Sequence, residues 1–326
     1  METGIEAEGL RKTFGSIRAL NGIDMVVRPG TVFSLLGPNG AGKTTAIRVL
    51  STLLRPDSGR AMVGGYDVVR APGEVRRLIG LTGQYAAVDE LLSGHENLYM
   101  LGRLVGLRAP DSRTRARELL TAFDLIDAAT KLVKSYSGGM RRRLDLAASI
   151  VGRPRFLYLD EPTTGLDPRS RRRLWDMIRA LVAEGTTVLL TTQYLEEADS
   201  LADEIVVIDH GRVIAAGEPE QLKTRVGGQV LQVEPADPAD LQKAGLILAA
   251  FAEGDEGASN DGRFVTVTIS DRSKLGHIVR LLDNAGIAVG DLSVRRPSLD
   301  EVFLALTHHV AGEEPRSHDT MEGSTA

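Results

Sequence analysis

Eight consecutive residues from Gly37 to Thr44 read GPNGAGKT and combine the residue types that hold phosphate groups. Glycines let backbone amides turn inward around phosphate oxygens. An apolar run before the loop and a helical pattern after it place those amides at a helix N-terminus. In such a loop Lys43 reaches the β and γ phosphates, and the Thr44 hydroxyl can hold Mg²⁺. The predicted nucleotide-binding residues here are Gly37, Asn39, Gly40, Gly42, Lys43, Thr44 and Thr45.

Two adjacent carboxylates, Asp160 and Glu161, end an apolar run that begins at Phe156. An aspartate at the carboxyl end of a parallel strand can support Mg²⁺, so Asp160 is predicted as a metal-site residue together with Thr44. Its neighbour Glu161 is the predicted general base, which would orient or deprotonate an attacking water. Because the pair accompanies a phosphate loop, it indicates nucleotide hydrolysis.

The elements that would position these groups alternate between short apolar runs and helical patterns from Ile17 to about Lys223. This alternation predicts an α/β fold with a largely parallel sheet. Amphipathic helices are expected over residues 113–133 and 170–183. Buried strands are expected over residues 31–36, 155–160, 186–192 and 204–211.

A second, smaller pattern of strands and helices begins after a plausible linker at 225–229. Valines and threonines alternate over 265–269, which is typical of a half-buried strand, and Ser298 with Glu301 forms a capping-box pattern that opens a helix. We therefore expect a small α+β domain whose role is open between regulation, dimer stabilisation and docking. The predicted organisation is 1–224 for the nucleotide-binding domain, 225–310 for the α+β domain and 311–326 for a disordered tail.

Composition excludes several classes of function. The 326 residues include no cysteine, so disulfides, thiolate metal sites and cysteine nucleophiles are absent. The net charge is −5, and the arginine triplets at 141–143 and 171–173 have no interleaved aromatic residues, which favours solvated or interfacial arginines over nucleic-acid binding. No apolar run approaches 18 residues, so the chain is not expected to span a membrane by itself.

Two further motifs flank the carboxylate strand. Ser137-Gly138-Gly139 lies upstream of it and Gly165-Leu166-Asp167 lies downstream. With the phosphate loop, these motifs resemble those of ABC-type ATPases over residues 5–224. The resemblance implies a P-loop ATPase domain with a helical subdomain that binds ATP and Mg²⁺. It also implies a homodimer in which Ser137, Gly138 and Gly139 of one chain bind the γ-phosphate of ATP held by the other.

Other positions carry over from the same resemblance one at a time. Gln84 matches the glutamine that links Mg²⁺ and the attacking water to the helical subdomain. Phe14 matches the aromatic residue that stacks on adenine, and Asp167 matches the aspartate that crosses the dimer interface. Gln193 stands where many relatives have histidine, and Met140 replaces the usual glutamine of the signature. Because an amide cannot exchange a proton as imidazole does, we expect slower hydrolysis or a stronger dependence on the general base. The predicted catalytic residues are Lys43, Gln84, Glu161 and Gln193, and the predicted Mg²⁺ residues are Thr44, Gln84 and Asp160.

Three stretches, at 82–104, 191–199 and 295–307, are similar to the daunorubicin-resistance type of drug-export ATPases. That similarity implies a peripheral subunit on the cytoplasmic face of the membrane. It would power a separately encoded permease that exports a hydrophobic drug such as an anthracycline, and residues 85–105 would face that permease.

Other readings stay open at this point. The cargo of an exporter of this type could instead be a lipid or a polysaccharide, and a soluble ABC-type ATPase outside transport is a further alternative. A single cassette without a heptad insertion disfavours the ribosome-acting and DNA-repair types. The Ser-Gly-Gly element argues against a plain nucleotide kinase or GTPase.

Overall fold

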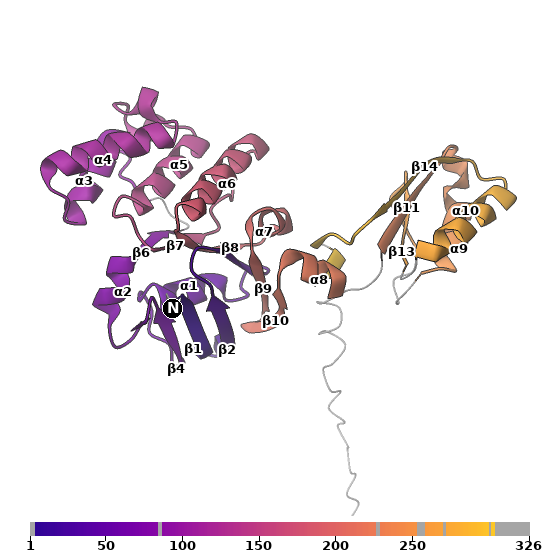
Figure 1. Ribbon diagram of the computed structural model, residues 1–326, viewed down its shortest axis with the longest axis horizontal. Helices are drawn as coiled ribbons and strands as arrows, with labels where there is room; N and C mark the ends of the chain where they lie inside the picture. The colour runs from indigo at the N-terminus through magenta and orange to yellow at the C-terminus, as the bar shows by residue number, and fades with distance from the viewer. Residues whose placement is uncertain are drawn as a thin grey trace, which may run out of the picture. The chain divides into compact units, whose positions relative to one another are not determined.

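The computed structural model describes residues 4–83, 87–225, 229–252, 258–269, 272–299 and 301–303. The chain divides into two compact units, Met1–Pro219 and Glu220–Ala326, which are described separately (Figure 1). Among the helices in these ranges, none has the length and apolar composition needed to cross a bilayer.

A six-stranded sheet with strand order β10-β9-β3-β8-β7-β6 forms the centre of the first unit. Its strands are parallel except for β10, which pairs with β9 in the antiparallel sense at one edge. Every residue of β3, β7 and β8 is buried, which explains why these segments are apolar along their length. The strands are β3 (Val32–Leu36), β6 (Ile79–Thr82), β7 (Phe156–Asp160), β8 (Thr187–Thr192), β9 (Glu204–Asp209) and β10 (Arg212–Gly217). The four predicted buried strands are therefore present, with slightly shorter bounds.

A second, antiparallel sheet with strand order β2-β1-β4-β5 packs on one side of the large sheet, with helix α1 (Lys43–Leu50) between the two (Figure 1). Phe33 and Tyr158 of the large sheet share a hydrophobic core with Ile47 of α1. Helix α2 (Pro72–Leu78) leads into β6. The strands are β1 (Ile5–Phe14), β2 (Ile17–Val27), β4 (Ser58–Val63) and β5 (Tyr66–Asp67).

Helices cover the opposite face of the large sheet. Side chains alternate between the two faces along a strand, so Leu157 and Leu159 pack into a separate core with these helices. Figure 1 shows α5 and α6 on this side, with α3 and α4 beyond them. The helices are α3 (Gly94–Leu104), α4 (Ala109–Ala122), α5 (Gly138–Ser149) and α6 (Pro168–Ala183), and the short α7 (Leu195–Leu201) follows β8.

The helix predicted over 113–133 is wrong in its bounds. Helix α4 ends at Ala122, and Asp124 then takes a left-handed conformation with φ of 53°. Two short 3₁₀ segments, Ile126–Ala128 and Val133–Ser135, carry the chain onward. Their apolar residues continue to enter the same core, which is why the sequence pattern extends beyond the true helix end.

The second unit contains a four-stranded antiparallel sheet with strand order β12-β13-β11-β14. Helices α9 (Leu241–Ala249) and α10 (Leu275–Asn284) share its hydrophobic core. The predicted capping box is present, because the Ser298 backbone N–H donates to Glu301 Oε2 at 2.6 Å and the Glu301 N–H donates to Ser298 Oγ at 3.3 Å. The remaining elements are α8 (Pro219–Arg225), β11 (Gln229–Pro235), β12 (Ser259–Asn260), β13 (Val265–Ile269), β14 (Val289–Arg295) and 3₁₀ turns at Pro238–Asp240 and Arg272–Lys274. The predicted tail at 311–326 lies outside the described residues.

Candidate functional site

The phosphate loop connects β3 to α1, as the sequence predicts. Gly42 has φ of 109°, and a Cβ at this position would lie 2.3 Å from the Ala19 carbonyl oxygen. A Cβ on Gly37 would lie 2.1 Å from the Ile208 carbonyl oxygen. Both positions therefore require glycine, because any side chain would push the loop away from its neighbouring strands.

Lys43 lies at the start of α1 with 3% of its side chain exposed. Its Nζ donates to the carbonyl oxygens of Gly37 at 2.7 Å and Pro38 at 3.0 Å, so the loop wraps around the ammonium group. Burial lowers the pKa of Lys43, and the Glu161 and Asp160 carboxylates oppose that shift. The arrangement holds one buried positive charge inside the glycine-rich loop, which suits a polyphosphate.

Three oxygen atoms meet next to the loop. Thr44 Oγ1 donates to Asp160 Oδ1 at 3.1 Å, and Thr191 Oγ1 donates to the same oxygen at 2.6 Å. In-register pairing of β7 with β8 places Asp160 directly beside Thr191. Hydroxyl and carboxylate oxygens are ligands that Mg²⁺ prefers, so this donor set fits that ion.

Glu161 follows Asp160 in a left-handed conformation with φ of 50°, which costs a residue with a side chain roughly 1–2 kcal/mol. Its backbone N–H donates to both the carbonyl oxygen and Oγ1 of Thr191, each at 3.1 Å. The turn directs the carboxylate toward the phosphate loop, where Oε1 lies 3.6 Å from Lys43 Nζ. Asp160 thus contacts Thr44 and Thr191, whereas the adjacent Glu161 lies near Lys43.

Of two further predicted residues, the structure describes one, at the end of the neighbouring strand β8. Gln193 follows β8 directly and is half-buried, while Gln84 lies outside the described residues. The chain is described on both sides of Gln84, from Gly83 backward and from Ala87 onward. Phe14, at the end of β1, is 48% exposed, and Lys12 Nζ lies 5.7 Å from the centroid of its ring.

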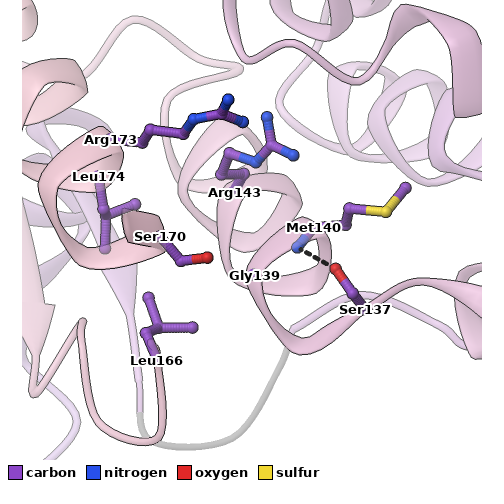
Figure 2. Close-up of a pocket in the computed structure, with 8 residues that line it drawn as sticks. All are labelled: Ser137, Gly139, Met140, Arg143, Leu166, Ser170, Arg173 and Leu174. Carbon is purple, nitrogen blue, oxygen red and sulfur yellow. Dashed lines mark hydrogen bonds between the residues drawn. The ribbon is translucent and has the colours of Figure 1, made fainter. Parts of the chain in front are cut away.

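The Ser-Gly-Gly element forms the N-terminus of α5. Ser137 caps this helix by accepting the Met140 backbone N–H at 3.2 Å (Figure 2). Asp167 caps α6 in the same way, because its carboxylate accepts the Ser170 N–H at 2.9 Å and the Ser170 hydroxyl at 2.6 Å. A Cβ on Gly139 would lie 2.8 Å from Ser170 Oγ, so the two helix starts are in close contact.

Figure 2 shows these two helix starts around a cavity of about 260 Å³, with the Arg143 and Arg173 side chains at one end. Both guanidinium groups lie near Asp124 Oδ2, at 3.0 Å and 3.5 Å respectively. A wider cavity of about 830 Å³ extends from Gly40 and Glu161 to Gly138 and Gly165. The phosphate loop and the Ser-Gly-Gly element of one chain therefore border the same open region.

Comparison with known proteins assigns this arrangement to a family. The family described as ABC transporter matches residues 20–164, and the family described as the C-terminal domain of ATP-binding protein DrrA1-3-like matches residues 217–307. The chain is 56% identical over 306 residues to the daunorubicin resistance ATP-binding protein DrrA2 of Streptomyces coeruleorubidus, covering 94% of this chain and 95% of that protein. The chain belongs to the ABC transporter ATP-binding proteins, in the daunorubicin-resistance group.

Two further comparisons extend this result. This ABC ATP-binding protein is 39% identical over 305 residues to the Nod factor export ATP-binding protein I of Ralstonia nicotianae, which covers 93% of each chain. A solved structure of an ATP-binding subunit of an ABC transporter superimposes with a TM-score of 0.62 at 27% identity, over 69% of this chain and 93% of that chain. The predicted P-loop ATPase fold, ATP binding and transport-coupled ATPase class are confirmed.

Sequence reasoning missed several residues of this ABC ATPase unit. Thr191 could have been found from the sequence, because it lies at the end of the strand before Gln193, and this strand pairs with the one that ends at Asp160. Arg142 carried no such signal. The sequence favours a solvated or interfacial arginine at this position, and the structure contradicts a solvated one. Its guanidinium group donates to the carbonyl oxygens of Glu161 at 2.7 Å and Pro162 at 2.6 Å. A third missed residue is Glu197, which is fully buried in α7.

Glu197 provides a stability prediction. Its Oε1 accepts the Trp175 indole N–H at 3.0 Å, but burial still raises the pKa of Glu197. A carboxyl whose pKa is raised on folding binds protons more tightly in the folded state, so the free energy of unfolding falls as pH rises above the unfolded-state pKa. Glu197→Gln keeps an acceptor for Trp175 and removes this ionisation. We expect its melting temperature to exceed that of the parent at pH 8 by roughly 2–4 °C, with little difference at pH 4.

Scanning calorimetry at the two pH values measures this difference. The control is Glu196→Gln, which changes the adjacent but exposed carboxylate that pairs with Arg171 at 3.1 Å. Equal melting shifts at both pH values, or a shift with the control, would contradict the assignment to Glu197.

Proposed function

We propose that this chain is the ATP-hydrolysing subunit of an exporter that removes a hydrophobic drug of the anthracycline class. The observation that carries the proposal is the 56% identity to a daunorubicin resistance ATP-binding protein, which extends over both units of the chain. ABC ATP-binding proteins act with membrane permeases, so the drug pathway itself lies in a partner. We infer that this permease is encoded separately and that the chain associates with it at the cytoplasmic face of the membrane.

In the proposed mechanism the amides of residues 37–45 surround the phosphates, and Lys43 neutralises charge that develops on the β and γ phosphates. Thr44 and Asp160 would hold Mg²⁺, with Gln84 as a further ligand, and this ion would supply Lewis acidity at the phosphates. Glu161 accepts the proton of the attacking water, and Gln193 donates its amide N–H to the γ-phosphate. Phe14 stacks on the adenine ring.

The proposed site is completed by a second copy of the chain. Ser137, Gly138 and Gly139 form the N-terminus of α5, where the first two residues are exposed and Gly139 is half-buried, and a helix N-terminus favours an anion. The γ-phosphate of ATP in the partner copy is the proposed anion, with Asp167 at the interface between copies. Binding of ATP would therefore close a homodimer, and hydrolysis would release it.

A candidate permease contact lies on the helical part of the first unit. Leu91, Leu104 and Val105 are 71%, 74% and 57% exposed, which is high for large apolar side chains. They fall in or next to α3, within the stretch 85–105 that the sequence predicts to face the permease. We infer that this surface transmits dimer closure to the membrane partner.

Drug export can be tested by expressing the chain together with the membrane protein encoded beside it in a drug-sensitive host. We expect resistance and energy-dependent efflux of daunorubicin, and loss of both when Glu161→Gln replaces the parent. The matched control is the membrane protein alone. Equal accumulation of the drug with the parent chain, with Glu161→Gln and with the membrane protein alone would contradict the drug assignment.

A second cargo class has a specific observation behind it. The Nod factor export relative shares 39% identity over 93% of this chain, so the chain's fold is compatible with an exporter of a different cargo. Resistance to no drug of a susceptibility panel, together with ATPase activity that the permease stimulates, would favour this alternative.

A further inference from the structure

Arg142 in α5 forms several hydrogen bonds to the backbone of the turn that carries Glu161. Its Nε donates to the Pro162 carbonyl oxygen at 2.6 Å, and Nη2 donates to those of Glu161 at 2.7 Å and Asp160 at 3.3 Å. Nη1 donates to the Gly83 carbonyl oxygen at 3.1 Å. One guanidinium group thus binds three consecutive carbonyls, from the last residue of β7 onward, and a fourth directly after β6.

The same helix holds the chain on the other side of Gln84. Asp145 lies three residues after Arg142 in α5, is 4% exposed, and accepts the Ala87 backbone N–H at 2.8 Å. Burial raises the pKa of Asp145, and the Ala87 hydrogen bond and the Arg142 charge counter that rise. Arg142 and Asp145 therefore bind the last described residue before Gln84 and the first one after it.

The conformation of Glu161 explains why such a clamp is needed. A glutamate with φ of 50° is in a sparsely populated region, and it keeps that conformation only where its surroundings fix it. Thr191 fixes the N–H side of Glu161, as described above, and Arg142 fixes its carbonyl side. With both peptide groups held, the carboxylate is directed toward Lys43 and the phosphate loop.

We propose that Arg142 is a positioning residue for hydrolysis, which holds the Glu161 turn in its strained conformation and ties it to helix α5. Because Ser137 caps the N-terminus of α5, the helix joins the proposed contact with the partner's γ-phosphate to the chain's own carboxylate. The inference rests on the proposed role of Glu161. The positioning role requires the planar, forked guanidinium group of arginine, because a single lysine ammonium cannot reach the carbonyl oxygens after β6 and after β7 at once.

The test compares Arg142→Gln and Arg142→Lys with the parent. We expect kcat for ATP to fall about 100-fold in Arg142→Gln and about 10-fold in Arg142→Lys, with KM within about threefold of the parent, because a shift of about 1 Å in a catalytic group has effects of this size. Arg117→Gln is the matched control, since Arg117 is exposed on α4. It should leave kcat unchanged.

Amide hydrogen exchange of the nucleotide-free protein gives a readout that is independent of activity. The Glu161 N–H should exchange faster in both Arg142 variants than in the parent, while amides in the centre of β8 stay protected. Parental kcat and exchange in Arg142→Lys would overturn the inference, because charge alone would then suffice. If Arg142→Gln fails to fold, the Arg142→Lys variant alone still decides the test.

The Glu161→Gln variant separates this inference from the proposal on which it rests. If that variant keeps parental turnover, the role of Glu161 is wrong. If it loses turnover while the Arg142 variants keep theirs, only the positioning role of Arg142 is wrong.

Discussion

Glu161→Gln is expected to lower steady-state ATP turnover at least about 100-fold, because an amide of the same shape cannot accept a proton from water. The fold around it should persist, since the backbone contacts of Glu161 to Thr191 and Arg142 do not involve the carboxylate. Phosphate release by the purified protein measures the change.

The same substitution should strengthen ATP binding. The Glu161 carboxylate lies 3.6 Å from Lys43 Nζ, so its negative charge competes with phosphate for that ammonium. Without this charge, ATP is expected to stabilise the dimer. The variant should then elute as a dimer in size-exclusion chromatography with Mg-ATP. Glu118→Gln, at a half-exposed carboxylate of α4, is the matched control. Parental turnover in Glu161→Gln would remove this residue as the general base.

Lys43→Ala is expected to weaken ATP binding at least about 100-fold and to abolish turnover. The Lys43 side chain is 3% exposed, and its ammonium group is bound by the loop carbonyls. The substitution therefore removes a desolvated positive charge from the place where the phosphates are expected to bind. Titration with a fluorescent ATP analogue measures the affinity.

The control for this change is Lys131→Ala, at an exposed lysine remote from the phosphate loop in sequence. Calorimetric unfolding of both variants distinguishes lost binding from lost structure. An affinity for ATP within threefold of the parent in a folded Lys43→Ala protein would contradict the assignment of the loop.

The features that the sequence predicts best are those set by local pattern. Gly37 to Thr44 and the pair Asp160-Glu161 both follow strands that are buried on both faces, and such strands are apolar along their whole length. Parallel strands bring their carboxyl ends to one edge of the sheet, which is why residues far apart in sequence could be assigned to one site.

The features that escaped prediction depend on contacts between distant segments. The four hydrogen bonds of Arg142 join residues that are 18 to 59 positions away along the chain, and nothing in a run of arginines marks the one that turns inward. The end of α4 was missed for a related reason. Apolar residues beyond Ala122 still enter the core, although the backbone has left the helix.

The central claim is that each ATP site combines the phosphate loop of one copy with the Ser137 turn of another. Mixed dimers test it most directly. Ser137→Asp keeps a good helix cap but repels phosphate, so this variant and Lys43→Ala should each be inactive alone.

A dimer that contains one chain of each variant, purified through two different tags, would have one site with an intact loop facing an intact serine turn. We predict that this mixed dimer recovers about half of the parental turnover, because one of its two sites is complete. A mixed dimer that stays as inactive as the two single variants would show that loop and serine turn act within one chain and would contradict the account.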